Sequence, residues 1–123
     1  MIPVEKRAVI LIVEDELLIR MHAVEMIEEA FEVIEAASAD EAIAILEARL
    51  DINVVFTDIQ MPGSMDGLKL AAAVRDRWPP IKIVATSGHV KIGAGDLPQG
   101  GRFLRKPYSP TEIMQTLREL IAA

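Results

Sequence analysis

Short runs of apolar residues alternate along the chain with longer stretches in which apolar residues recur every three or four positions. A short apolar run bounded by polar residues is typical of a buried strand, whereas the longer spacing is typical of an amphipathic helix. We predict five strands from this pattern: Ala8–Val13, Phe31–Ala37, Ile52–Thr57, Ile81–Ala85 and Arg102–Arg105. The first has no polar residue and is expected to be covered on both faces, while the more polar second strand suits an edge.

Helices are predicted in the stretches that connect or follow these strands. They are Glu16–Ala30, Ala39–Arg49 behind a capping box of Ser38 and Glu41, a helix that opens at Asp66 or Gly67 and runs to Arg77, and a last helix that opens at Ser109 or Pro110. The apolar residues at helical spacing in the first helix are Leu17, Met21, Val24 and Ile27. We expect Met21, Met26 and Leu18 to pack in the core, with a partner-binding surface as the alternative.

This alternation of strands and helices predicts a three-layer α/β sandwich, a (βα)5 unit whose parallel sheet carries helices on both faces. The unit between Ser87 and Arg102 is defective, because it contains five of the seven glycines of the chain together with Pro98. Glycine costs about 1 kcal/mol inside a helix relative to alanine, and proline about 3 kcal/mol. We therefore expect an irregular Gly-rich loop here, with at most one turn around Val90–Ile92.

Composition narrows the possible functions. The length of 123 residues suits one domain, 1–123, and 51% of the residues are apolar, which is enough for a core. The net charge of −6 argues against nonspecific binding to nucleic acid or to an anionic membrane. There is no cysteine, so disulfides and zinc thiolates are excluded. The N-terminus lacks a secretion signal and Ala8–Val13 is too short to span a bilayer, so we expect a cytoplasmic protein.

Polar side chains follow the predicted strands at the points where the strands end. Glu14-Asp15 follow the first strand, Asp58 follows the third, Thr86-Ser87 follow the fourth and Lys106 follows the fifth. Ligands of open α/β sheets bind at the carboxyl ends of parallel strands. We therefore expect these side chains to converge at one edge of the sheet.

The acidic members of this set predict a cation. If the first and third strands are neighbours, Glu14, Asp15 and Asp58 lie close together, and two like charges about 4 Å apart repel by about 4 kcal/mol at an effective dielectric constant of 20. Such a cluster is tolerated when one group is protonated or a cation binds. Oxygen-only ligands favour Mg²⁺, or Mn²⁺, over zinc. With a hydroxyl from Thr86 or Ser87 and the ammonium of Lys106 nearby, Asp58 can act as a nucleophile toward phosphorus.

Each of these residues alone has a simpler interpretation. Asp58 could cap a helix or sit in a turn, Glu14 or Asp15 could cap the first helix, Ser87 could be a solvated loop residue, and Lys106 a surface lysine. Their joint occurrence at one end of the predicted sheet favours a site. Two arginines, Arg20 and Arg105, are expected to be solvent-exposed, with contact to a partner as the alternative.

At this point the chain resembles the receiver domain of two-component response regulators, from Val9 to about Leu120. The motifs that carry the resemblance are Val13-Glu14-Asp15-Glu16, Val54 to Pro62 around Asp58, Asp66-Gly67, Thr86-Ser87-Gly88 and Lys106-Pro107. Each motif is weak alone, but their order and spacing are specific. The resemblance implies a flavodoxin-like fold with strand order 2-1-3-4-5.

The resemblance also implies residue roles. It makes Asp58 the acceptor of a phosphoryl group from the phosphohistidine of a sensor histidine kinase or a histidine phosphotransfer protein. The other matching positions are Glu14 and Asp15 for Mg²⁺, the backbone carbonyl of Gln60 as a third protein ligand, Ser87 as the switch hydroxyl, Lys106 as the partner of the acyl phosphate, Pro107 as a candidate cis-proline, and Phe103 as the switch aromatic. For Phe103 a core aromatic is an equal alternative.

Two departures from the family pattern affect the expected signalling surface. The loop from Met61 to Gly67 looks one residue longer than usual. The weakened fourth helix remodels the face on which the family dimerises and signals, so we expect a monomer or a weak dimer. We also expect the segment Gly88–Gly101 to change its order when Asp58 is phosphorylated, because such a switch needs a segment of low stability.

The leading functional hypothesis is a phosphoacceptor switch that is not an enzyme. No output domain follows the receiver before the sequence ends at Ala123. A stand-alone receiver would signal to an unknown downstream protein by direct contact or pass phosphoryl groups on in a relay, whereas an excised receiver would have its output in a part of the protein that this sequence does not include. One alternative is a small Mg²⁺-dependent phosphohydrolase, although Gln60 occupies the position where such enzymes carry a general acid. Another is a pseudo-receiver that binds partners without phosphorylation.

Overall fold

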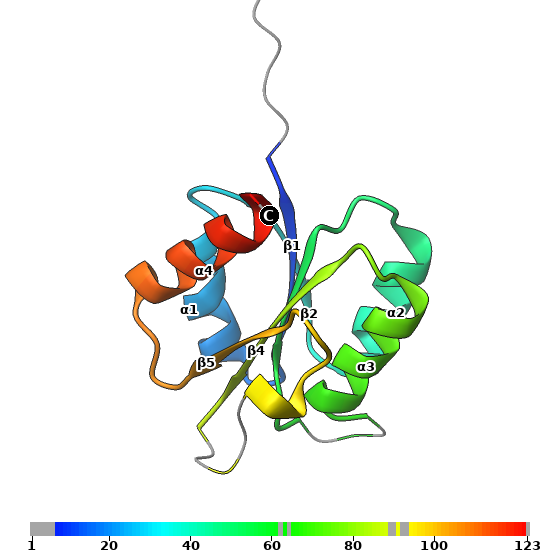
Figure 1. The fold of residues 1–123 in the computed structure, drawn as a ribbon. Helices are drawn as coiled ribbons and strands as arrows, with labels where there is room; N and C mark the ends of the chain where they lie inside the picture. The colour runs from blue at the N-terminus through cyan, green and yellow to red at the C-terminus, as the bar shows by residue number, and fades with distance from the viewer. Residues whose placement is uncertain (1–6, 62, 64, 89–90, 92–93, 123) are drawn as a thin grey trace, which may run out of the picture.

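The strands form one parallel sheet. The computed structural model describes residues 7–61, 63, 65–88, 91 and 94–122. The strands are β1 (Val9–Val13), β2 (Glu32–Ala36), β3 (Val54–Asp58), β4 (Lys82–Ser87) and β5 (Arg102–Arg105). All neighbouring strands are parallel, and their order is β2-β1-β3-β4-β5 (Figure 1). The predicted strand order and the edge position of the second strand are confirmed.

In the described part of the chain, two helices cover each face of the sheet. The helices are α1 (Leu17–Ile27), α2 (Ala39–Ala48), α3 (Gly67–Arg77) and α4 (Pro110–Ala122). The pair α1 and α4 packs on one face, and the pair α2 and α3 packs on the other (Figure 1). The expected three-layer sandwich is therefore confirmed.

Polar side chains define where three of the helices begin. Ser38 accepts a hydrogen bond from the amide of Glu41 at 3.1 Å, and Asp66 accepts one from the amide of Lys69 at 2.9 Å. At α4, Ser109 and Glu112 exchange side-chain to backbone bonds of 3.0 and 3.1 Å, a reciprocal capping box. These caps satisfy amides that have no partner inside the helix and so fix each starting point.

The core has two halves, one on each face of the sheet, and β1 contributes to both. Val9, Leu11 and Val13 pack toward α2 and α3, whereas Ile10 and Ile12 pack toward α1 and α4. This alternation follows from the two-residue period of a strand, and it explains why β1 contains only apolar residues. The buried strands β1 and β3 therefore hold the residues that follow them in a rigid frame.

The connection between β4 and β5 contains no regular α-helix among its described residues. It contains one short 3₁₀ helix, η1 (Ala94–Asp96), which confirms that a helix is shortened here. Leu97 packs against the half of the core beside α3, and Arg75 donates a 2.6 Å hydrogen bond to the carbonyl of Gln99. Most of the turn expected at Val90–Ile92 lies outside the described residues, as does part of the segment Gly88–Gly101, so the expected change of order stays a prediction.

The main error of the sequence prediction concerns α1. Leu17, Leu18 and Met21 are 56%, 80% and 47% exposed, so the expected core packing of Leu18 and Met21 is wrong. The helix instead buries Ala23 and Ile27, and Met26 packs partly against the core. Apolar residues occur on every side of this helix, so their spacing alone does not select the buried face. The helix also ends at Ile27 instead of Ala30.

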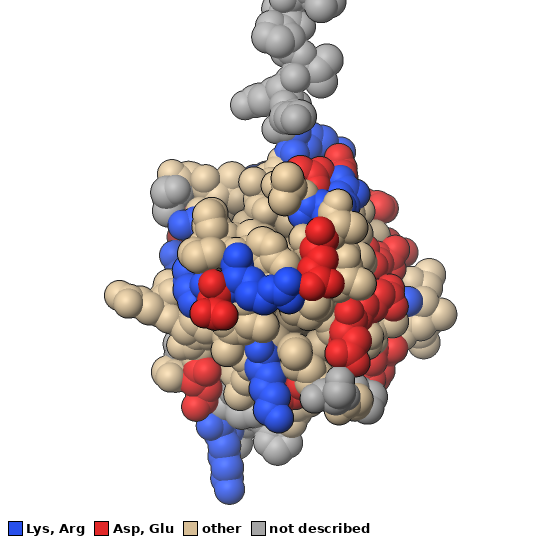
Figure 2. Space-filling model, turned by 90° about the vertical axis from the view of Figure 1, so that its right-hand side faces the viewer, with Lys and Arg blue, Asp and Glu red and all other residues tan. Residues whose placement is uncertain are grey.

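The face formed by α2 and α3 carries both signs of charge. Figure 2 shows Lys and Arg side chains interspersed with Asp and Glu on this face. Arg77 of α3 pairs with Glu47 of α2 at 2.7 Å, and the Arg77 guanidinium lies 4.4 Å from the centre of the Trp78 ring. Exposed pairs of this kind contribute about 0.2 to 1 kcal/mol each. Within the described part of the chain, no helix combines the length and apolar character needed to cross a bilayer.

Candidate functional site

Three carboxylates meet at the carboxyl ends of β1 and β3. One ligand oxygen from each of Glu14, Asp15 and Asp58 lies within 4.8 Å of the others. Asp58 is the last residue of β3 instead of the residue after it, and Glu14 extends the β1–β2 ladder by donating its amide to Ala36 at 3.0 Å. Glu14 and Asp58 are only 4% and 6% exposed. The structure thus brings together the three acids that the sequence analysis selected.

Lys106 supplies positive charge to this cluster. Its ammonium lies 3.2 Å from Glu14 Oε1 and 3.3 Å from Asp58 Oδ1. The backbone amide of Lys106 donates to the carbonyl of Ser87 at 3.0 Å, which holds the end of β5 beside the end of β4. Lys106 is therefore a member of the cluster and not the surface lysine of the simpler interpretation.

The turn after Lys106 is held by an aromatic contact. The Lys106–Pro107 peptide bond is cis, as expected for this position. Tyr108 packs edge-on against Phe56 of β3, with ring centres 5.8 Å apart and planes at 87°. This contact ties the segment that carries the ammonium to the strand that carries Asp58. Tyr108 was not predicted as a site residue, because its one signal in the sequence is its position two residues after Lys106.

Burial and proximity change the acidity of all three charged partners. Burial raises the pKa of Asp58, and Lys106 and the amide of Gln60 oppose this only in part. Burial and the neighbouring Asp58 likewise raise the pKa of Glu14, against the bond from the amide of Glu16 and against Lys106. For Lys106, burial acts to lower the pKa, but the carboxylates of Asp58 and Glu14 outweigh it and the pKa is raised. The cluster is therefore short of positive charge when both acids are ionised.

The N-terminus of α3 approaches the end of β3 very closely. The amide of Gly67 donates to the carbonyl of Ile59 at 2.8 Å. A methyl group at position 67 would overlap the carbonyl oxygen of Asp58 and the backbone of Ile59. Glycine is thus required here because of space. Gly67, the first residue of α3, thus lies directly beside Asp58.

The donor set fits a hard divalent cation. The three acids offer only oxygen, and two of them are buried next to each other, so a bound cation would relieve their repulsion. Mg²⁺ prefers one or two carboxylates together with water and phosphate oxygens. Asp15 is half-buried, so it is the most solvent-accessible of the three acids. The amide of Gln60 hydrogen-bonds the Asp58 carboxylate. Coordination by the Gln60 carbonyl stays a prediction.

The two expected switch residues occupy neighbouring strands. Ser87 is fully buried at the end of β4, so it is not a solvated loop residue. Phe103 is partly exposed on β5 and stands beside Ala85 in the parallel register. Their roles as switch hydroxyl and switch aromatic stay predictions.

Arg20 contributes to the site in a way that the sequence analysis missed. Its side chain is only 15% exposed, so the expectation of a solvent-exposed arginine is wrong. It donates to the backbone carbonyl of Glu14 at 2.8 Å and to Glu35 Oε1 at 3.0 Å. Only the tertiary fold brings α1, β2 and the end of β1 together, so no local pattern could have revealed these bonds. Arg105 is exposed, as expected.

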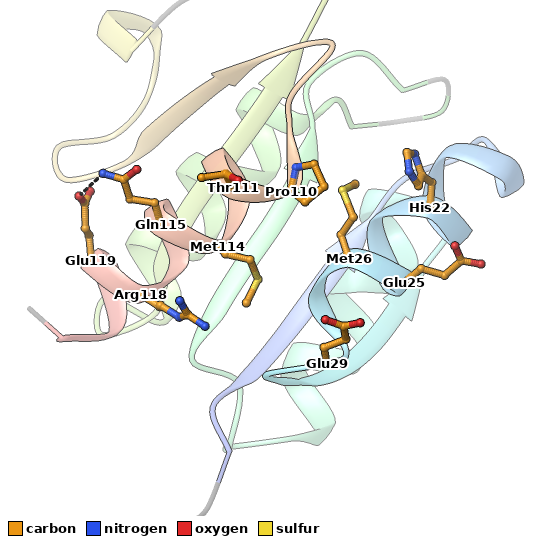
Figure 3. A pocket seen from close by; sticks show the side chains of 10 residues that line it. All are labelled: His22, Glu25, Met26, Glu29, Pro110, Thr111, Met114, Gln115, Arg118 and Glu119. Atoms are coloured by element: carbon orange, nitrogen blue, oxygen red, sulfur yellow. Dashed lines mark hydrogen bonds between the residues drawn. The ribbon is translucent and has the colours of Figure 1, made fainter.

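A separate groove of about 810 Å³ lies between α1 and α4. Met26 and Met114 extend into it from the two helices, with Glu25 and Arg118 at its sides (Figure 3). None of the four charged residues of the cluster lines this groove. We therefore place the candidate site at the end of the sheet and not between these helices.

Comparison with known proteins agrees with this geometry. The family model described as "Response regulator receiver domain" matches residues 10–118. The chain is 33% identical over 123 residues to the hydrogenase transcriptional regulatory protein HoxA of Cupriavidus necator, covering 97% of the chain and 25% of HoxA. It is 35% identical to the sensor kinase CckA of Brucella abortus, covering 93% of the chain and 12% of CckA. The chain thus spans a quarter or less of the length of these two relatives.

Solved structures show the same fold. The response regulator protein TrrA of Thermotoga maritima, in complex with Mg²⁺ and BeF, superimposes with a TM-score of 0.82 at 27% identity. The match covers 92% of this chain and 98% of the TrrA chain.

Proposed function

Because the chain belongs to the response regulator receiver domain family, we propose that Asp58 accepts a phosphoryl group from a phosphohistidine in a Mg²⁺-dependent reaction. The observation that carries this proposal is the position of Asp58. Its carboxylate is buried at the end of β3, 3.3 Å from the Lys106 ammonium and within 4.8 Å of two further acids. We treat 1–123 as one receiver domain that acts as a signalling switch and not as an enzyme on an external substrate.

The proposed step is a phosphoryl transfer between two side chains. The P–N bond of the donor phosphohistidine breaks, and a bond forms between phosphorus and an Asp58 carboxylate oxygen. The imidazole nitrogen keeps the electron pair of the broken bond, and the product is an acyl phosphate. Asp58 suits this role because its carboxylate is held in place by Lys106 and by the amide of Gln60.

The remaining residues of the cluster stabilise charge. The Lys106 ammonium, now shared between Glu14 and Asp58, would pair with a phosphoryl oxygen once Asp58 is phosphorylated. Glu14 and Asp15 would hold Mg²⁺ together with Asp58 and the Gln60 carbonyl, and the ion would supply charge neutralisation for the phosphoryl oxygens. Ser87 and Phe103 would report the phosphorylated state from β4 and β5.

The exposed side of α1 supports docking of a phosphodonor protein. Leu18 lines a groove of about 430 Å³ together with Lys106, Pro107 and Tyr108, so apolar surface adjoins the reactive end of the sheet. With Leu17 and Met21, which are also exposed on α1, Leu18 contributes to a group of apolar side chains, and exposed apolar patches mark protein–protein contacts. We propose a sensor histidine kinase or a histidine phosphotransfer protein as the donor, in the cytoplasm, and leave the downstream target of the signal unnamed.

Intact-mass measurement tests the proposal. The chain is incubated with acetyl phosphate, with and without Mg²⁺, and compared with Asp58→Asn. We expect the wild-type chain to gain the mass of one phosphoryl group only with Mg²⁺, and Asp58→Asn to gain none. Equal labelling of Asp58→Asn would place the acceptor elsewhere and overturn the proposal.

Two further outcomes separate the alternatives. A chain that is never labelled and shows no response to beryllofluoride would be a phosphorylation-independent binding module. Steady turnover of a simple phosphomonoester by the wild type, absent in Asp58→Asn, would identify a phosphohydrolase. The proposed switch predicts neither.

A further inference from the structure

We infer that Arg20 is a positioning residue for the metal-binding loop, an assignment that rests on the proposed function. Its guanidinium holds the backbone carbonyl of Glu14 at 2.8 Å and thereby sets the direction in which the Glu14 and Asp15 carboxylates point. Arg20 itself touches no reacting atom. Mg²⁺ then binds well only when this backbone bond is made.

The bonds around Glu14 show why its carbonyl matters. The amide of Glu14 donates to Ala36, Oε1 accepts from Lys106 at 3.2 Å, and Oε2 accepts from the amide of Glu16 at 3.2 Å. The carbonyl is the remaining polar group of this buried residue, and Arg20 is its partner. The four bonds reach Glu14 from different elements, so loss of one allows the peptide between Glu14 and Asp15 to rotate. Such a rotation moves both carboxylates relative to Asp58.

The start of α1 needs this external support. Glu16 precedes the helix and makes no side-chain capping bond, unlike Ser38 before α2 and Asp66 before α3. Two other hydrogen bonds hold the first turn. The amide of Glu16 donates to Glu14 Oε2, and the amide of Arg20 donates to the carbonyl of Glu16. The loop that carries the two acids is therefore anchored by its own side chain and by Arg20, one turn further along the helix.

An arginine suits this position because it has several donors in one rigid plane. One terminal nitrogen of the guanidinium donates to the Glu14 carbonyl. Its Nε donates to the carboxylate of Glu35 on β2, at a distance of 3.0 Å. The Glu35 carboxylate keeps the guanidinium in the orientation that the carbonyl requires. A lysine offers a single ammonium nitrogen and cannot reproduce this two-point arrangement.

The two possible roles of Arg20, as a positive charge or as a positioning residue, predict opposite effects of its removal on Mg²⁺ affinity. If Arg20 acted only through its positive charge, its removal would leave the acidic cluster more negative and tighten Mg²⁺ binding. If Arg20 positions the loop, its removal weakens binding, because residues that orient metal ligands typically contribute about 10- to 100-fold to affinity. The sign of the change therefore separates the two explanations.

The test is calorimetric titration of the full chain with Mg²⁺ alone. We expect Arg20→Ala to weaken Mg²⁺ binding about 10-fold or more and Arg20→Lys to fall between Arg20→Ala and the wild type. The matched control is Arg49→Ala, since Arg49 also bridges two acids, Glu32 on β2 and Asp51, but far from the cluster. Asp15→Asn shows which part of the heat signal comes from this site.

Amide hydrogen exchange without metal tests the positioning role directly. The same measurement also shows whether the variant is folded. We expect the amide of Glu16 to exchange faster with solvent in Arg20→Lys than in the wild type, with unchanged exchange in the core strands. Unchanged or tighter Mg²⁺ binding in both Arg20 variants, or equal weakening in Arg49→Ala, would overturn the inference. Absence of phosphorylation in the wild type would count against the proposed function alone, because the Glu16 exchange rate does not depend on it.

Discussion

Asp58 is a carboxylate that the fold buries beside a second carboxylate, that of Glu14, and beside the ammonium of Lys106. Its pKa is raised by burial, which Lys106 offsets only in part. The folded chain therefore keeps a proton on this group to higher pH than the unfolded chain does. The ionised group accordingly lowers the free energy of unfolding at neutral pH, and this cost is removed as the pH falls. Such strain is typical of a functional site.

Removing the charge of Asp58 tests whether the ionised carboxylate destabilises the folded chain. In the absence of metal, we expect Asp58→Asn to raise the free energy of unfolding at pH 7 by on the order of 1 kcal/mol. The gain is expected to shrink as the pH falls and to vanish below about pH 4, where the unfolded carboxyl also binds its proton. Urea unfolding of both chains from about pH 3 to about pH 8 measures this gain. A destabilised Asp58→Asn at pH 7 would show that the pair with Lys106 dominates instead.

At the scale of residues, the sequence could predict which acids meet but not how they are held. Glu14, Asp15 and Asp58 end neighbouring parallel strands, and strand ends of one sheet lie at one edge by geometry. Arg20 was wrongly expected to be exposed because its partners lie on a strand and a loop that only folding brings near. Local patterns carry no information about such distances.

Among the elements, α1 differs most from its predicted behaviour. It buries Ala23 and Ile27 and leaves Leu17, Leu18 and Met21 exposed. Because apolar residues occupy all of its sides, the helix satisfies the core on one side and retains an apolar surface on the other. The apolar residues that the prediction wrongly placed in the core therefore form an exposed side of α1 that is suited to docking.

Exchange of one exposed leucine separates docking from folding. We expect Leu18→Ser to slow phosphotransfer from a phosphorylated histidine phosphotransfer protein several-fold while labelling by acetyl phosphate stays unchanged. The free energy of unfolding should change by less than about 0.5 kcal/mol, since Leu18 is 80% exposed. Leu50→Ser is the matched control, because Leu50 is 98% exposed in the loop after α2 and does not line the groove beside Lys106. Equal rates for both variants would argue against docking on α1.

The junction of β3 and α3 gives a second prediction at this scale. We expect Gly67→Ala to lower the free energy of unfolding by about 2 kcal/mol or more, because the added methyl group overlaps the backbone of Asp58 and Ile59. Labelling by acetyl phosphate should also slow, since any relief moves Asp58. Gly95→Ala is the control, as a methyl group there meets no atom within 4 Å. Thermal denaturation of both variants measures the difference, and a neutral Gly67→Ala would contradict the close approach.

For the molecule as a whole, alternation of strands and helices predicted a parallel sheet between two helical layers, and the resemblance supplied the strand order. The glycines between Ser87 and Arg102 correctly predicted a shortened helix, because they raise the cost of helix formation at several positions at once, and the described residues of this connection form one 3₁₀ helix and no α-helix. What could not be predicted is how this connection is anchored. Leu97 packs beside α3, and Arg75 reaches Gln99 across 24 positions of sequence.

Metal binding connects the site to the stability of the whole molecule. A cation that binds only the folded chain stabilises it by about 2.7 kcal/mol at a concentration 100-fold above its dissociation constant. We therefore expect Mg²⁺ to raise the melting temperature of the wild type by several degrees at pH 7.5. The raised pKa values of Glu14 and Asp58 mean that Mg²⁺ must displace protons from them as the pH falls, so the increase should shrink toward pH 5. Asp15→Asn should lose most of the increase, whereas Asp76→Asn, an exposed acid on α3, should keep it. An increase that is the same at every pH, or the same in Asp15→Asn, would mean that Mg²⁺ binds outside this cluster.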